Sequence, residues 1–149
     1  MHNYDPQLAQ RVWQRVQGGG QETDPQPPLF SLLYATAADA ALCLQLADRH
    51  KGSTAALLRE ISTEKQGHAS CLKGILQMAG EASLAIQASP GSHRTPQAAL
   101  RHCLGSTLRC AEQYRQWQTH GEYGPVFAVL GQQEAVLAKK LLQALGQLS

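Results

Sequence analysis

The stretch that decides the fold is STAALLREISTEKQGHASCLKGILQMA, residues 53–79. Its apolar residues recur at intervals of three and four, which is the pattern of one face of an amphipathic helix. Lys65 and His68 interrupt that face at its centre. A buried polar group without a partner costs on the order of 2–7 kcal/mol, so both side chains require partners inside the protein. The positions on this face are Leu58, Ile61, Lys65, His68, Leu72, Ile75 and Ala79.

Similar stripes predict three more long helices, over residues 29–50, 96–120 and 126–148. Ser53 or Thr54 is expected to cap the second helix, and Thr95 followed by proline to cap the third. The other three stripes are Leu33, Thr36, Ala40, Cys43 and Ala47; Leu100, Cys103, Thr107, Cys110 or Ala111, Tyr114 and Trp117; and Phe127, Leu130, Glu134, Leu137, Leu141 and Leu145.

The connections between these segments predict the topology. Residues 81–94 form a longer link than most helix–helix connections, between the second and third helices. A long crossover at that point is typical of a ferritin-like bundle. Residues 6–16 predict a short N-terminal helix, followed by a proline-rich strap. We therefore expect an all-α chain, with the N-terminal helix and strap over residues 1–28 and a ferritin-like four-helix bundle of two hairpins over residues 29–149.

Composition narrows the functional classes. The 149 residues suit a single domain, and 43% hydrophobic with 16% charged residues is ordinary for a globular protein. A net charge of +2 without a basic run argues against nucleic acid as a partner. We expect no apolar run to approach the roughly 20 residues that span a bilayer. The N-terminus lacks the charged start and apolar core of a secretory signal. We therefore expect a soluble cytoplasmic protein with no membrane partner.

The four cysteines fall inside predicted helices and form no CxxC pair. In a cytoplasmic chain this pattern favours small buried residues over disulfides or redox chemistry. The four are Cys43, Cys71, Cys103 and Cys110.

Two segments carry a resemblance to a known family. Residues 57–80, LLREISTEKQGHASCLKGILQMAG, resemble the second helix of rubrerythrin-like bacterial members of the ferritin-like superfamily, which reads L-x-x-I-x-x-D-E-x-x-H-A. Residues 39–50, DAALCLQLADRH, are similar to their first helix, which reads roughly D-A-x-x-Y-x-x-L-A. The opening residues 5–16 are similar to the lead-in of some small members. The resemblance implies a homodimer as a possible assembly.

In that family each hairpin supplies one glutamate and an E-x-x-H pair, and the six ligands hold two iron or manganese ions. His68 matches the first histidine, but Lys65 stands at the position of its glutamate. Glu134 matches the second glutamate, but Leu137 stands at the position of its histidine. The positions of the two single glutamates carry Thr36 and Thr107. The resemblance therefore implies a degenerate di-iron site.

Two interpretations of these residues remain open. In the first, no cofactor is bound, and Lys65 pairs with Glu134 across the bundle in place of the metal charge. His68, Thr36 and Thr107 then complete a central polar layer in a structural, binding or regulatory protein whose protein or small-molecule partner is unknown. In the alternative, His68, Glu134 and Glu64, with a cysteine nearby, hold iron, manganese or zinc in an oxidoreductase with a reduced ligand set.

Overall fold

The structure, a computed structural model, describes residues 27–80 and 86–148. Within these residues it contains four α-helices and no β-strand, so the prediction of an all-α bundle is confirmed. The predicted helix over residues 6–16 lies outside the described residues. The four helices are α2 (Leu29–Asp48), α3 (Gly52–Met78), α4 (Pro96–Trp117) and α5 (Gly124–Leu148).

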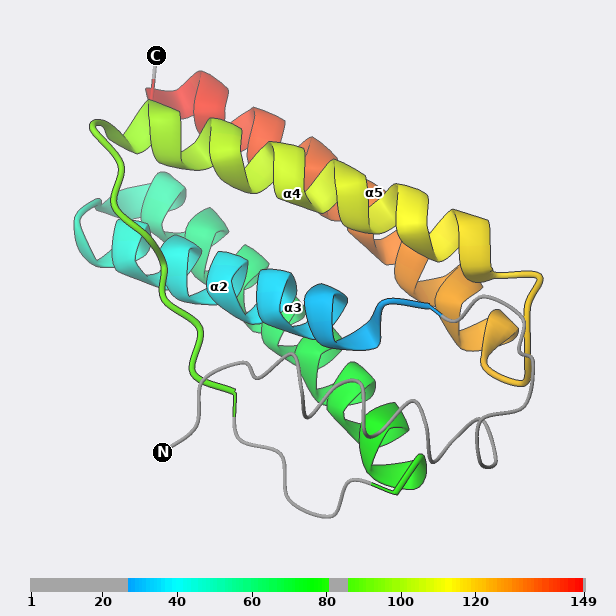
Figure 1. The fold of residues 1–149 in the computed structure, drawn as a ribbon. Helices are drawn as coiled ribbons and strands as arrows, with labels where there is room; N and C mark the ends of the chain where they lie inside the picture. Colours follow the sequence, from blue (N-terminus) through cyan, green and yellow to red (C-terminus); the bar gives the residue numbers. More distant parts are fainter. Residues whose placement is uncertain (1–26, 81–85, 149) are drawn as a thin grey trace.

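The helices form two antiparallel hairpins, α2 with α3 and α4 with α5 (Figure 1). The hairpins pack side by side, so that α2 contacts α4 and α3 contacts α5. Helix α3 ends and α4 begins at opposite ends of the bundle, and residues 86–95 lead into the start of α4 (Figure 1). Each helix therefore has two main neighbours, and the four inward faces meet along the bundle axis.

The start of α4 is as predicted, and the start of α3 is not. Thr95 Oγ1 accepts a hydrogen bond from the backbone nitrogen of Ala98 at 3.0 Å. In contrast, α3 is preceded by Lys51, which makes no side-chain capping bond. The predicted cap at Ser53 or Thr54 is therefore wrong. The Thr54 hydroxyl instead donates to Gln147 Oε1 on α5 at 2.7 Å, a contact that local sequence rules do not reveal.

Two apolar clusters make up the core, one toward each end of the bundle. The predicted stripes are buried except at Ala79 and Leu145, and on α4 it is Cys110, not Ala111, that is buried. The first cluster contains Leu29, Phe30, Leu32, Leu33, Leu72, Ile75, Leu76, Cys110, Tyr114, Trp117, Phe127 and Leu130. The second contains Leu42, Cys43, Leu46, Ala47, Leu58, Ile61, Ala99, Leu100, Cys103, Leu137, Leu141 and Ala144.

Helix α2 is more apolar than predicted. An 18-residue window within it has a mean hydropathy of 1.5, so by length and composition alone it could cross a membrane. The prediction that no apolar run approaches that length was wrong. However, 56% of this window is buried inside the bundle, and the core helix of a water-soluble bundle meets the same criteria.

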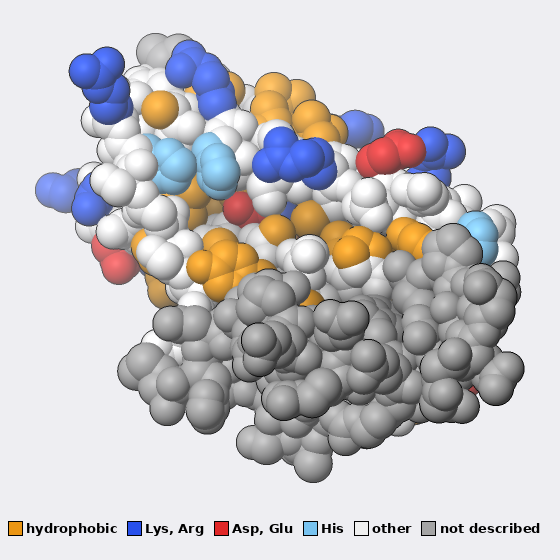
Figure 2. Space-filling view, in the orientation of Figure 1, with side chains coloured by type: hydrophobic (Ala, Val, Ile, Leu, Met, Phe, Trp, Pro, Cys, Tyr) orange, Lys and Arg blue, Asp and Glu red, His pale blue; other side chains and the backbone are white. Residues whose placement is uncertain are grey.

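On the described part of the face in Figure 2, lysine and arginine side chains are scattered, and hydrophobic side chains lie across the middle.

Candidate functional site

The ammonium group of Lys65 lies between the two apolar clusters, with partners on the three other helices. Its Nζ donates to Thr107 Oγ1 on α4 at 2.6 Å and to Glu134 Oε1 on α5 at 2.9 Å. A longer contact, 3.5 Å, joins it to Asp39 Oδ2 on α2. Because the Lys65 side chain is 0% exposed, these contacts replace its water shell completely. The contact between Lys65 and Glu134, expected from the sequence, is present.

Glu134 links this lysine to His68. Its second oxygen, Oε2, lies 2.5 Å from His68 Nδ1, so both carboxylate oxygens have a partner. Burial alone would raise the pKa of Glu134, but the hydrogen bond from His68 and the charge of Lys65 together hold that pKa below its ordinary value. Glu134 is therefore ionised at neutral pH.

The same contacts keep Lys65 charged. Burial by itself would lower the pKa of this lysine, but the nearby carboxylates of Glu134 and Asp39 outweigh that cost and raise the pKa above its ordinary value. At neutral pH the centre of the bundle thus holds a cation next to an anion.

Asp39 belongs to this network and was not among the candidate residues from the sequence. Its pKa is raised because it is buried, although Lys65 and a hydrogen bond with Ser106 offset part of the shift. Asp39 follows Thr36 by three residues, and that spacing places both on one face of the helix. This spacing was the signal that could have identified it.

Thr36 is buried as predicted but does not join the hydrogen-bonded layer. Among residues 27–80 and 86–148, no hydrogen bond joins its Oγ1 to Lys65, His68 or Glu134; it lies instead beside the thiol of Cys110 and the hydroxyl of Tyr114 and lowers the pKa of both. Thr36 therefore stays outside the hydrogen bonds that join Lys65, Glu134 and His68. Asp39, on the same face, supplies the oxygen that contacts Lys65 instead.

The residues present do not fit a metal centre. Glu64 points away from the core, where its Oε2 lies 2.8 Å from Lys140 Nζ and its side chain is 40% exposed. It therefore does not join His68 and Glu134, and the Lys65 ammonium would repel a cation beside them. Within the described part of the chain, no three His, Cys, Asp or Glu residues form a group that could hold a metal ion.

The cysteines are all unpaired thiols, and three of the four are buried as predicted. Cys43 and Cys103 face each other from α2 and α4 with their Sγ atoms 3.7 Å apart, too far for a disulfide bond. Burial raises the pKa of Cys110 to about 12, so that thiol stays protonated. Cys71, the fourth, is half-buried.

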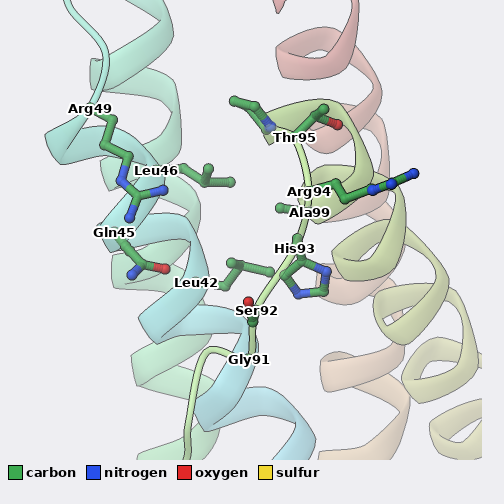
Figure 3. A pocket seen from close by; sticks show the side chains of 11 residues that line it. Leu42, Gln45, Leu46, Arg49, Gly91, Ser92, His93, Arg94, Thr95 and Ala99 are labelled. Carbon is green, nitrogen blue, oxygen red and sulfur yellow. The ribbon is translucent and has the colours of Figure 1, made fainter.

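A small pocket of about 170 Å³ lies between α2, the start of α4 and the loop before it. Two arginines contribute to its lining, which at first suggests an anion site. Figure 3 shows that Arg94 extends over α4 while Arg49 stays on α2 beside Gln45. Because the two guanidinium groups do not converge, the pocket lacks the geometry to clamp an anion.

The two outermost residues of the hydrogen-bonded network, Asp39 and His68, each line a larger cavity. Asp39 helps to line a cavity of about 450 Å³ between α2, α4 and the loop before α4. His68 helps to line a groove of about 610 Å³ between α3 and α5. The network from Asp39 through Lys65 and Glu134 to His68 therefore extends across the bundle between two different pairs of helices.

No protein-family model, no curated protein and no solved structure matches this chain.

Proposed function

We propose that this chain is a ferritin-like bundle in which a lysine ammonium has replaced the metal ions, and that it acts as a non-catalytic binding or regulatory protein. The observation that carries the proposal is the position of the Lys65 Nζ, 2.9 Å from Glu134 and 2.6 Å from Thr107. By the family resemblance, Glu134 stands at the position of a metal ligand, and Thr107 stands where the family has a ligand glutamate.

The arrangement of the helices supports the ferritin-like part of the proposal. The end of α3 and the start of α4 lie at opposite ends of the bundle (Figure 1). A ferritin-like bundle, with its one long crossover, needs the same arrangement. The polar residues also lie at the middle of the helices, between the two apolar clusters, where such bundles hold their cofactors.

Electrostatics supports the loss of metal. A single carboxylate in a dry core is costly unless a cation faces it. Lys65 supplies that cation through its own side chain, and both oxygens of Glu134 are already occupied. An ammonium held in this way offers neither an open coordination position nor a redox couple, so we assign no catalytic step to the site.

Metal content tests the proposal directly. The protein should be purified without a metal-affinity tag and analysed for iron, manganese and zinc. We expect each metal well below one equivalent per chain. Stoichiometric iron, manganese or zinc would contradict the proposal and support an oxidoreductase that uses a reduced ligand set.

A rebuilt site tests the topology. Restoring the four missing ligands with Thr36→Glu, Lys65→Glu, Thr107→Glu and Leu137→His should create binding of about two cobalt(II) ions, visible by absorption spectroscopy. The matched control adds His68→Gln, which removes one ligand and should weaken cobalt binding.

Helix content by circular dichroism must accompany this experiment, because three new buried carboxylates destabilise a metal-free bundle. If the four-substitution chain is helical but binds no cobalt, the ligand positions do not converge and the ferritin-like assignment is wrong. The smaller variant Lys65→Glu with Leu137→His tests the same convergence with less disturbance.

A further inference from the structure

The groove between α3 and α5 has an apolar wall on α5 and the imidazole of His68 on α3. Its α5 side is formed largely by Pro125, Val126, Val129 and Leu130, and Val129 is 51% exposed. Its volume, about 610 Å³, lies in the range of small-molecule sites. The α3 side is Glu64, Gly67, His68 and Cys71.

His68 is set into this groove by a bond on its inner side. Its Nδ1 contacts the buried carboxylate of Glu134, while the residue lines the groove and keeps 6% of its surface exposed. No described residue hydrogen-bonds its other ring nitrogen, Nε2, and that atom is not among the buried unsatisfied groups. Nε2 is therefore the ring nitrogen available to a ligand.

The partner of Nδ1 also decides which nitrogen carries the hydrogen. An ionised carboxylate can only accept hydrogen bonds, so Nδ1 must donate to Glu134. In the neutral imidazole this leaves a lone pair on Nε2. The groove thus presents the Nε2 lone pair of His68 as a hydrogen-bond acceptor beside an apolar wall.

The charged side chains near His68 are already paired with one another. Glu64, one helical turn before His68, is paired with Lys140 at 2.8 Å, and the inner charges of Lys65 and Glu134 are paired with each other. A neutral molecule meets no unpaired charge from these four residues.

We propose that the groove binds a small phenol. The hydroxyl of the phenol donates to His68 Nε2, and its ring packs on Val126 and Val129. A phenol is a neutral donor at physiological pH, which suits an acceptor nitrogen in an apolar setting. This inference rests on the proposed function, because it needs Glu134 to hold His68 without a metal ion.

The test uses a matched pair of probes, 4-ethylphenol and its methyl ether 4-ethylanisole, in which a methyl group replaces the hydroxyl hydrogen. Binding to the full chain is followed by NMR titration of backbone amides on α3 and α5. We expect 4-ethylphenol to bind about fivefold or more tightly than 4-ethylanisole, the ratio that one neutral hydrogen bond provides. Nitrogen-15 spectra of the imidazole should show hydrogen on Nδ1 and a shift of Nε2 on binding.

Cys71 gives a second readout inside the groove. It is half-buried, whereas the other three cysteines are buried, so N-ethylmaleimide should modify Cys71 first. Bound 4-ethylphenol should slow this reaction, and 4-ethylanisole at the same concentration should slow it less.

Two variants locate the hydrogen bond. His68→Phe keeps a ring in place and should abolish the preference for 4-ethylphenol over 4-ethylanisole. Gln133→Leu, at another polar position of the groove, should leave that preference unchanged. A preference that follows Gln133 instead of His68 would overturn the assignment.

Other outcomes also overturn the inference. If the two probes bind equally well, the proposed hydrogen bond to His68 is absent. If neither probe binds, the groove is not a binding site for phenols. Tighter binding of 4-ethylbenzoate than of 4-ethylphenol would show a charged imidazolium and a carboxylate site. If the purified chain is nevertheless free of metal and the rebuilt site binds cobalt, the phenol inference fails while the proposed function stands.

Discussion

Two lysines, one on α3 and one on α5, form ion pairs with glutamates of the other helix, and the two sites differ mainly in burial. Lys65 of α3 reaches Glu134 of α5 at 2.9 Å, and both side chains are 0% exposed. Lys140 of α5 reaches back to Glu60 and Glu64 of α3 at 2.5 and 2.8 Å, with its own side chain 25% exposed. The same charges on the same pair of helices therefore occur once in a dry core and once at the surface.

This difference shows that the distance between two charges does not by itself determine how much an ion pair contributes to folding stability. At the surface, water and salt screen the charges, and each partner can be solvated if the other is lost. In the core, neither charge has water to replace a lost partner, so removing one leaves the other stranded. The buried pair is therefore needed as a unit, whereas the exposed pair is dispensable.

The largest effect is expected from removing one buried charge. Lys65→Met keeps most of the side-chain volume but leaves Glu134 without its cation. The free energy of unfolding should fall by about 3–5 kcal/mol, as for other broken buried pairs. Urea denaturation followed by circular dichroism measures it. A loss similar to that of Lys140→Met would show that burial does not separate the two pairs.

Removing both buried charges should recover a large part of this loss. In the double variant Lys65→Met with Glu134→Leu, the carboxylate of Glu134 is removed together with the ammonium, while Asp39 keeps its buried carboxyl on α2. We expect the double variant to be more stable than Lys65→Met alone by about 2 kcal/mol or more. A double variant no better than the single would show that the cost comes from packing and not from the stranded charge.

Acid should weaken the buried pair through Glu134. The pKa of Glu134 in the folded protein lies below its ordinary value of 4.5, so in that interval the unfolded chain binds more protons. Stability therefore falls as the pH falls from about 5 through the lowered folded pKa. Glu134→Gln removes this group and should flatten the acid loss, measured as the melting temperature between about pH 3 and pH 6.

Asp39 provides the control with the opposite sign. Its folded pKa lies above the ordinary 3.8, so the folded protein binds more protons in that interval, and this contribution to stability falls as the pH rises. Asp39→Asn should therefore make the acid loss steeper than in the wild type. If both variants flatten it, the acid dependence arises elsewhere in the chain.

The smallest effect is expected at the surface. Lys140→Met breaks the contacts with Glu60 and Glu64, yet it should cost at most about 1 kcal/mol because all three side chains are partly exposed. The cost should shrink further in roughly 1 M salt, where screening is nearly complete. Urea denaturation at low and high salt measures both quantities. A salt-independent cost above about 2 kcal/mol would contradict the comparison.

Helical periodicity predicted the four long helices and nearly all of their inward faces. It also placed Lys65 and Glu134 at the middle of facing stripes, and these two residues are in contact in the structure. Such predictions succeed because periodicity depends on local geometry, which a single sequence records.

The errors concern contacts between helices. The Thr54 hydroxyl bonds Gln147 instead of capping its own helix. Asp39, not Thr36, contacts Lys65 from α2. Glu64 is drawn outward by Lys140, so the reduced metal-ligand set does not assemble. In each case the side chain contacts a residue distant in the sequence, and a local sequence pattern does not specify that contact.

The sequence by itself determined that this protein is a helical bundle with charged residues at its centre, because burying an amphipathic stripe also buries the residues that interrupt it. Only the tertiary structure decided which charges meet and which nitrogen of His68 remains open to the groove. Those outcomes depend on side-chain reach and on the registration of helices from two hairpins. Both are set by the packing of the whole core.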